Sequence, residues 1–471
     1  MHRLLRLMLR SVSVIPLLLA EASAQTTPLV IANYTQDEAA YGNTIADYQK
    51  DIQDAQSMGI DGFELDMMGW GSEVSYFDYQ TAVANIFTAA HNLDTNFRLY
   101  FMIDCQRYGT ICQTAAGAMM AQYASHPNYL HYQGRPVMSS FEASYNSNAG
   151  SFDETFWHGV YTAVTGHGIT PYYLPSTLNA DIVIAPANLA SQIIADTTWY
   201  ENHLKADSNG IAVWGFDVPS VNAANQDALA SVLRSNNKTL MATVVPFFSQ
   251  LRFLFVSGAG AVQNMEQHGA EGLIGSWMDI INNLRPPLVR LQTWNDHTES
   301  YANLASTATL TANDVSNWQM PAAALWSHAA YAHLNQYFTR WYKTGTQPAN
   351  WPDSMYVFYR NGAQALVPSS APSGTSVNWE PDGVEPTLDD IYITTILRSP
   401  ATVTVYSGRN TTTIHASSGV NSYRVPFTTG TQSFTVDRGG SALISITGAN
   451  IVTSESQYYN VNPLAYYGHS P

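Results

Sequence analysis

The densest group of chemically useful side chains in this sequence is the segment Trp294-Asn295-Asp296-His297-Thr298-Glu299-Ser300. Asp296 and Glu299 are three residues apart, a spacing that lets two carboxyl groups face one pocket on a helical turn. Cleavage of a glycosidic bond needs such a pair, because one group protonates the leaving oxygen while the other activates water or attacks the sugar. The same spacing also fits a helix N-cap box, so the spacing alone leaves both interpretations open.

Further carboxylates are predicted to lie near this pair, because each ends or follows a short apolar run. In a parallel barrel, the carboxyl ends of the strands point into one site. Unpaired charge is costly to bury, so chance would explain one or two acids at such positions and not a whole set. We interpret the set as groups that bind sugar hydroxyls or tune the catalytic pair: Asp66, Asp104, Glu142 and Asp217.

The secondary structure elements that would position these acids are strands that alternate with helices along the chain. Strands are predicted at residues 29–34, 59–67, 97–104, 136–142, 170–176, 211–217, 240–248 and 288–296. Apolar residues recur at helical spacing in 44–58, 79–91, 224–235 and 258–269, and 321–343 supplies a last helix. This alternation predicts an α/β fold, a (β/α)8 barrel of the TIM type, over residues 25–345 rather than an open sheet.

Aromatic side chains accompany the acids near the predicted strand ends. Each ring by itself fits core packing, whereas together they suit stacking on the apolar faces of sugars. We therefore predict that they bind substrate, together with His297 beside the catalytic pair: Tyr34, Trp70, Trp214, Phe248 and Trp294.

Beyond residue 345 the amino-acid composition and the hydrophobic pattern of the chain change. Alternating stretches rich in Thr, Ser, Val and Tyr, separated by turn residues, predict a C-terminal antiparallel β-sandwich over residues 346–471. We favour a stabilising cap on the barrel as its role. A carbohydrate-binding module is the alternative, because aromatic residues serve packing and sugar binding alike.

The first 24 residues predict a secretory signal peptide. Arg3, Arg6 and Arg10 precede an apolar run, and Ala22-Ser23-Ala24 fits a cleavage site. That run is too short to span a bilayer, and no later stretch approaches the ~20 apolar residues that a spanning helix needs. We therefore expect a secreted protein, extracellular or in the cell wall, without a membrane anchor. The net charge of −16 argues against nucleic acid as a partner, because such binding needs a basic surface.

The two cysteines, Cys105 and Cys112, predict a disulfide, since secreted proteins fold in an oxidising compartment. A reactive thiol is the weaker alternative, because no activating histidine is nearby. No clustered ligand spacing indicates a metal, and no cofactor is predicted. Glycosylation sequons begin at Asn33, Asn237 and Asn410. We expect a monomer that acts on a neutral polysaccharide.

Several of these segments resemble glycoside hydrolase family 71, the fungal α-1,3-glucanases or mutanases. The resemblance runs from about residue 30 to 360 and is strongest at residues 293–300, which are similar to the family's W-N-D-[YF]-G-E-S. Residues 59–63, 101–104, 135–142 and 213–217 are also similar to family segments. The family usually has Asn at the position of Asp66, and Tyr-Gly at the position of His297-Thr298. A charge at Asp66 is expected to raise the pKa of a neighbouring group.

The resemblance implies that Asp296 and Glu299 are the catalytic pair of an inverting endo-hydrolase of α-1,3-glucan. It does not assign the acid and the base between them. Two other functions stay open from the sequence: the same barrel acting on another neutral α-glycan, or a glycan-binding wall protein without activity.

Overall fold

The computed structural model describes residues 27–39, 41–71, 76–105, 111–141, 154–176, 205–214, 219–249, 262–265, 267–296, 327–363, 377–378, 389–452 and 463–471. The predicted signal peptide and the residues Glu142, Asp217, His297 and Glu299 lie outside these ranges.

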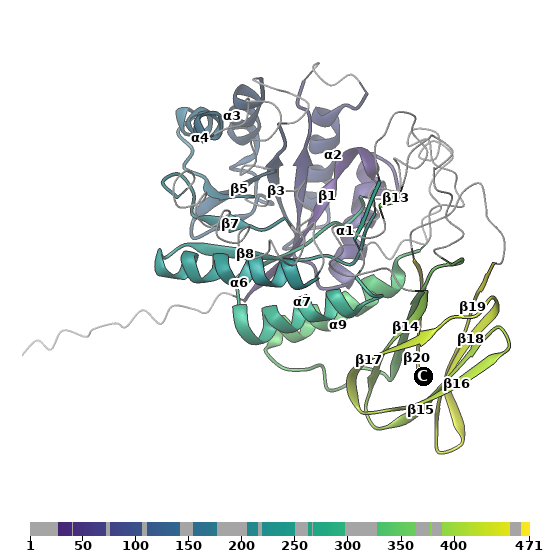
Figure 1. Ribbon diagram of the computed structural model, residues 1–471. Helices are drawn as coiled ribbons and strands as arrows, with labels where there is room; N and C mark the ends of the chain where they lie inside the picture. Colours follow the sequence, from purple (N-terminus) through teal and green to yellow (C-terminus); the bar gives the residue numbers. More distant parts are fainter. Residues whose placement is uncertain are drawn as a thin grey trace, which may run out of the picture.

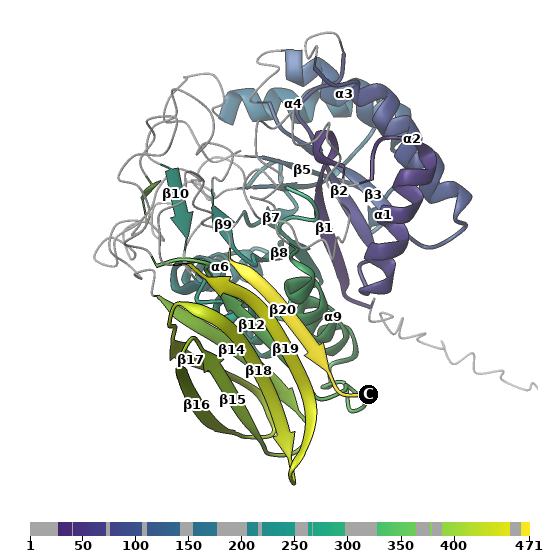
Figure 2. The ribbon, with the colours of Figure 1, turned by 90° about the vertical axis from the view of Figure 1, so that its right-hand side faces the viewer.

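The N-terminal part of the chain folds around a curled sheet of mainly parallel strands (Figures 1 and 2). Its parallel strands are β1 (Leu29–Thr35), β2 (Gly62–Met67), β3 (Arg98–Ile103), β5 (Arg135–Ser140), β6 (Tyr172–Pro175), β7 (Gly210–Ala212), β8 (Thr239–Val244) and β11 (Leu288–Leu291). They run in the order β6-β5-β3-β2-β1-β11-β8-β7, and β4 (His131–Tyr132) pairs antiparallel with β5. Each of the strands predicted from the sequence in this half therefore contributes to one sheet.

Helices cover the outer face of this sheet (Figure 1). They are α1 (Ile45–Ser57), α2 (Tyr79–Asn92), α3 (Ile111–Tyr123), α4 (Glu154–Gly166), α6 (Pro219–Ser235), α7 (Glu271–Asp279) with the π-helical turn η5 (Ile280–Leu284), and α9 (Ala329–Thr344). A short 3-10 turn, η1 (Gln36–Glu38), follows β1. Both faces of the sheet are covered, so all six residues of β2 are buried, Glu64 and Asp66 among them.

Helix α1 shows how local sequence sets these elements. Thr44 and Asp47 form a reciprocal capping box that satisfies the first free backbone N–H groups of the helix. Tyr48, Ile52 and Ala55 recur at helical spacing and are buried against the sheet. The helix gives way to Gly59, whose φ of +85° suits a residue without Cβ.

The structure shortens several predicted strands and replaces one predicted helix. The predicted strand 211–217 ends at Ala212, for example. The predicted strand 240–248 is two elements, because β8 ends at Val244 and Phe248 begins the short strand β9 (Phe248–Ser249). The predicted strand 288–296 ends at Leu291. The helix predicted at 258–269 is wrong: Val262–Met265 form strand β10, which pairs with β9 and with β13 (Val377–Asn378), and the helix begins at Glu271. Pairing between distant segments outweighed the local helical spacing there.

In the C-terminal part, the residues that the structure describes include two antiparallel four-stranded sheets (Figure 2). One contains β17 (Gly419–Pro426), β14 (Asp390–Leu397), β12 (Ser354–Tyr359) and β20 (Leu464–His469). The other contains β16 (Asn410–Ala416), β15 (Ala401–Ser407), β18 (Gly430–Arg438) and β19 (Ser441–Ile451). Alternate residues of both sheets, such as Val357, Ile393, Val405 and Phe434, share one apolar core.

The sheet that contains β14 and β17 packs against the N-terminal part. Arg424 on β17 forms an ion pair with Glu271 at the start of α7, and the same guanidinium lies beside the ring of His268. Tyr356 and Tyr392 join the large N-terminal core although they belong to the C-terminal sheet. The two parts are therefore in extensive contact.

The structure also bears on the predicted absence of a membrane anchor and on the predicted glycosylation sequons. Among the described residues, no helix combines the length and apolar composition needed to cross a bilayer. Asn33, which begins a sequon, is completely buried and donates a hydrogen bond to Glu64, so glycosylation at Asn33 is incompatible with this fold. Asn237 and Asn410 are exposed.

Candidate active site

Four aspartates gather at the carboxyl edge of the curled sheet, and we call them the carboxylate cluster: Asp37, Asp66, Asp104 and Asp296. Asp66 ends β2, where it is in register with Thr35 of β1, and Asp104 directly follows β3. Asp296 follows β11, and Asp37 lies in η1 after β1. Strands β11, β1, β2 and β3 are neighbours in this order, and parallel neighbours end on the same side.

Strand register and hydrogen bonding place these aspartates near one another: Asp66 is in register with Thr35 of β1 and Met102 of β3, and the Asp104 N–H donates to the carbonyl of Met67 at 3.2 Å. Burial is the largest cause that raises the pKa of the Asp66 carboxyl well above its ordinary value. The negative charges of Asp104, Asp37, Glu64 and Asp296 raise it further, in that order. Oδ1 of Asp66 is buried and accepts no hydrogen bond from the described part of the chain. Asp66 therefore favours the protonated, neutral form.

Asp296 is held in place by contacts of Thr293 and Asn295, which precede it by three residues and one residue. Its backbone N–H donates to Oγ1 of Thr293 at 2.9 Å. The Asn295 side chain accepts from the Thr35 N–H at 2.8 Å and donates to the carbonyls of Thr35 at 2.7 Å and Glu38 at 3.1 Å. Asn295 is completely buried, whereas Asp296 is partly exposed. The segment is thus fixed to the end of β1, while Asp296 keeps part of its surface exposed.

The sequence analysis predicted that Tyr34 and Trp294 bind substrate, and the structure places both side chains elsewhere. Both side chains are completely buried, and both donate hydrogen bonds to Asp51 of α1, Tyr34 Oη at 2.8 Å and Trp294 Nε1 at 3.0 Å. Their rings therefore lie between the sheet and α1, where no sugar can stack on them. Burial raises the pKa of Asp51 to about 7, although these two hydrogen bonds oppose the shift. Together they anchor the Asp296 segment to α1.

A buried ion pair lies next to the carboxylate cluster. Glu64 precedes Asp66 by two residues on β2, so both side chains face the same side of the sheet. Nε of Arg290 on β11 lies 2.8 Å from Oε2 of Glu64, and neither side chain is exposed. Tyr100 and Ser139 also donate to Oε1 of Glu64, at 2.9 and 2.5 Å. This network joins β2, β3, β5 and β11 within the curl of the sheet.

Of the other three aromatic candidates, Trp70 and Trp214 follow strand ends, whereas Phe248 lies within a short strand. Trp70 follows β2, and its ring meets Tyr123 edge to face. Trp214 follows β7, contacts Phe141 edge to face and lies 5.1 Å from the Arg290 guanidinium. Phe248 is completely buried in β9. Trp70 and Trp214 keep small exposed fractions, 8% and 4%, so they suit the wall of a site better than Phe248 does.

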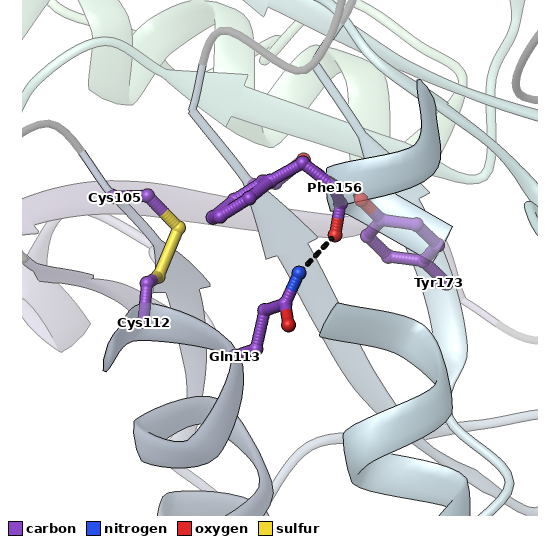
Figure 3. The surroundings of a disulfide bond; sticks show 6 residues. Cys105, Cys112, Gln113, Phe156 and Tyr173 are labelled. Carbon is purple, nitrogen blue, oxygen red and sulfur yellow. Dashed lines mark hydrogen bonds between the residues drawn. A yellow bond between two sulfur atoms is a disulfide. The ribbon is translucent and has the colours of Figure 1, made fainter. Parts of the chain in front are cut away.

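Cys105 and Cys112 are joined by a disulfide (Figure 3). Cys105 directly follows Asp104, and Cys112 lies in the first turn of α3. Next to Cys112, Gln113 donates a hydrogen bond to the carbonyl of Phe156 in α4 at 3.0 Å. The disulfide therefore ties the end of β3 to the start of α3.

The sequence reasoning named Asp66, Asp104 and Asp296, which the structure brings together, and missed three residues of the same region. Glu64 and Arg290 sit inside apolar strands, where the period of two relative to Asp66 was an available signal for Glu64. Asp37 lies just past the end of the predicted first strand. Glu142, Asp217, His297 and Glu299 lie outside the described residues, so their positions stay predictions. Among the described side chains, no group of His, Cys, Asp or Glu is arranged to hold a metal ion.

Comparison with known proteins gives one consistent answer. The family model described as glycosyl hydrolase family 71 matches residues 26–470. A glucan endo-1,3-alpha-glucosidase of Schizosaccharomyces pombe is 26% identical over 445 residues, which cover 92% of this chain and 93% of that protein. A mutanase of Penicillium rubens is 26% identical, with 95% and 90% covered, and an ascus wall endo-1,3-alpha-glucanase of S. pombe is 25% identical, with 82% and 83% covered. The resemblance found in the sequence motifs is confirmed.

Proposed function

Because this chain belongs to glycosyl hydrolase family 71, we propose that it is a secreted glycoside hydrolase that cleaves α-1,3-glucan internally and with inversion. The relatives named as α-1,3-glucanases and a mutanase support this substrate. The observation that carries the proposal is the convergence of Asp296 with Asp66 and Asp104 at one edge of the sheet. Secretion is supported by the predicted signal peptide and by the relative of the ascus wall.

The proposed mechanism assigns the chemistry to Asp296 and Glu299. One of them protonates the leaving glycosidic oxygen, and the other removes a proton from the water that attacks the opposite face of the sugar. Asp296 suits either role, because its backbone is fixed by Thr293 and Asn295 while the residue is partly exposed. Asp66 and Asp104, with Glu142 and Asp217, would bind the hydroxyl groups of the sugar on either side of the scissile bond.

The same proposal covers the architecture. The curled sheet would form a (β/α)8 barrel at residues 25–345, closed between β6 and β7, where the N–H of Asn209 donates to the carbonyl of Tyr173 at 2.8 Å. The two C-terminal sheets would form a β-sandwich at 346–471 that caps the barrel, which their shared apolar core and the contacts of β17 with α7 support.

The test of the function is sugar release from insoluble α-1,3-glucan. We expect the purified chain to release reducing sugar from this polymer, and to act at least tenfold more slowly on α-1,4-glucan, β-1,3-glucan and α-mannan. Because inversion places the new hydroxyl on the opposite face, NMR of the first products should detect the β-anomer before mutarotation. Release of the α-anomer would contradict inversion, and preference for another polymer would contradict the substrate.

A second prediction concerns Asp66, where the family usually has Asn. Burial and neighbouring charges raise the pKa of Asp66, so its carboxyl stays neutral to a higher pH than an exposed aspartate, and a neutral carboxyl resembles an amide in charge and shape. We expect Asp66→Asn to keep activity within about threefold at acidic pH and to stay active at higher pH than the wild type. The wild type should lose activity first, because Asp66 ionises as the pH rises through its raised pKa.

Stability gives the same prediction an independent readout. The folded state holds the Asp66 proton at pH values where the unfolded chain has released it, since the unfolded value is about 3.9. Stability is therefore lost as the pH rises from about 4 toward the folded pKa, and Asp66→Asn should lack this loss and melt higher at neutral pH. Asp78→Asn, an exposed N-cap that Asn also supports, is the matched control. If Asp66→Asn is inactive at every pH, Asp66 acts as a carboxylate and the interpretation fails.

A further inference from the structure

A cavity lies at the opposite end of the strands from the carboxylate cluster. Its volume is about 1020 Å³, at the upper end of the roughly 300–1,000 Å³ that ligand pockets occupy. It is lined by Pro28, which precedes β1, by Pro287, which precedes β11, and by the last residues of α9. Strands β1 and β11 are parallel, so these prolines mark their amino ends whereas Asp296 and Asp37 follow their carboxyl ends.

The wall of this cavity carries a rigid aromatic platform. Trp277, Phe338 and Trp341 form a stack in which neighbouring rings are nearly parallel, with centroids 6.3 and 6.1 Å apart and interplanar angles of 11° and 15°. Trp277 and Phe338 are buried, whereas Trp341, the outermost ring, is partly exposed and lines the cavity. Next to it the Tyr342 hydroxyl donates to the carbonyl of Pro286 at 2.5 Å. The platform is therefore held in place before any ligand binds.

The polar groups around the platform suit a neutral, hydroxyl-rich ligand. Asn282, Thr27 and Thr344 line the cavity and offer amide and hydroxyl groups. No carboxylate is among the lining residues that the structure describes, although the whole chain carries a net charge of −16. The ammonium group of Lys343 is already bound to Asp61 and to the carbonyl of Gly59. Arg285 supplies guanidinium donors from a left-handed backbone with φ +46° and ψ +50°.

From these observations we infer that the cavity beside Trp341 is a second glucan-binding site, separate from the catalytic one. An aromatic face fixed beside neutral hydrogen-bonding groups is the arrangement that recognises a sugar ring. The inference rests on the proposed function, since the ligand is the same polymer. A site at the far end of the barrel would hold the enzyme on an insoluble particle while another stretch of glucan enters the catalytic edge, which raises the effective concentration of substrate.

The test compares an insoluble polymer with a soluble oligosaccharide. Trp341→Ala should lower the rate on insoluble α-1,3-glucan about 5- to 10-fold, and leave kcat/KM on a soluble α-1,3-glucan oligosaccharide within twofold. In an Asp296→Asn background, which prevents turnover, Trp341→Ala should reduce sedimentation of the chain with glucan particles by a similar factor. Tyr406→Ala, which removes an exposed ring on β15, is the matched control and should change neither quantity.

Two further variants keep the test decisive if Trp341→Ala folds poorly. Arg285→Gly removes the guanidinium at a backbone position that glycine adopts freely, and Trp341→Tyr keeps a smaller ring. We expect weaker particle binding from the first and near-normal binding from the second. Equal losses on both substrates, or no loss on the polymer, would overturn the inference. If the wild type cleaves no α-1,3-glucan but still sediments with it through Trp341, the proposed activity fails and the binding site stands.

Discussion

Asp296→Asn is expected to lower the turnover of α-1,3-glucan by about 10²–10⁴-fold, the range that general acid or base catalysis contributes. The amide keeps the shape of the side chain and cannot exchange a proton at moderate pH. Asp296 is only partly exposed and its backbone is held by Thr293, so the loss should be one of chemistry. Binding of a soluble oligosaccharide, measured by calorimetry, should stay within about fivefold of the wild type.

Glu299→Gln is the partner experiment, and the two variants together assign the roles. The variant that lacks the acid should regain rate on an aryl glycoside whose leaving group needs no protonation, whereas the variant that lacks the base should regain rate with added azide. Asp78→Asn, a surface carboxylate at the start of α2, controls for loss of one charge. Near-normal turnover by both amides would exclude this pair as the catalytic residues.

The sequence was sufficient to predict that Asp66 and Asp104 converge, because the ends of apolar strands are easy to recognise in it. Apolar runs that stop at an acid located Asp66 and Asp104, and parallel order then placed them on one edge. Side-chain direction was harder to predict. A strand that is covered on both faces lacks the alternation of polar and apolar residues that would distinguish its inner face from its outer face. The sequence therefore places Tyr34 in the site, although its side chain faces Asp51 of α1.

The residues that were missed, or assigned to the wrong place, depend on contacts between distant segments. Trp294 belongs to the packing of α1 because its indole N–H reaches Asp51, 243 positions away. Arg290 lies inside an apolar strand, and only its partner on β2 explains a charge there. The strand β10 replaced a predicted helix because its pairing with β9 gives its backbone N–H and C=O groups partners. Local periodicity carries no information on such pairings.

The Glu64 and Arg290 pair gives the largest expected effect on stability. Glu64→Gln keeps the shape of the side chain and removes its charge, which leaves the Arg290 guanidinium buried without a counter-charge. Removing one partner of a buried pair costs about 3–5 kcal/mol of unfolding free energy. Both side chains have no exposed area, so solvent screening does not reduce this cost. Urea unfolding followed by tryptophan fluorescence should report a lower midpoint with an unchanged slope.

A double mutant separates the charge from the packing. Arg290→Met alone should also be destabilising, because it leaves the Glu64 carboxylate buried without a counter-charge. Glu64→Gln combined with Arg290→Met removes both charges and should recover much of the stability. The recovery need not restore activity. Arg290 also donates to the carbonyl of Val213 at 3.0 Å and lies over the ring of Trp214, so the double mutant should misplace the end of β7 and lose turnover while it remains folded. Two single variants whose losses simply add in the double mutant would contradict this prediction, because additivity shows that the two charges do not depend on each other.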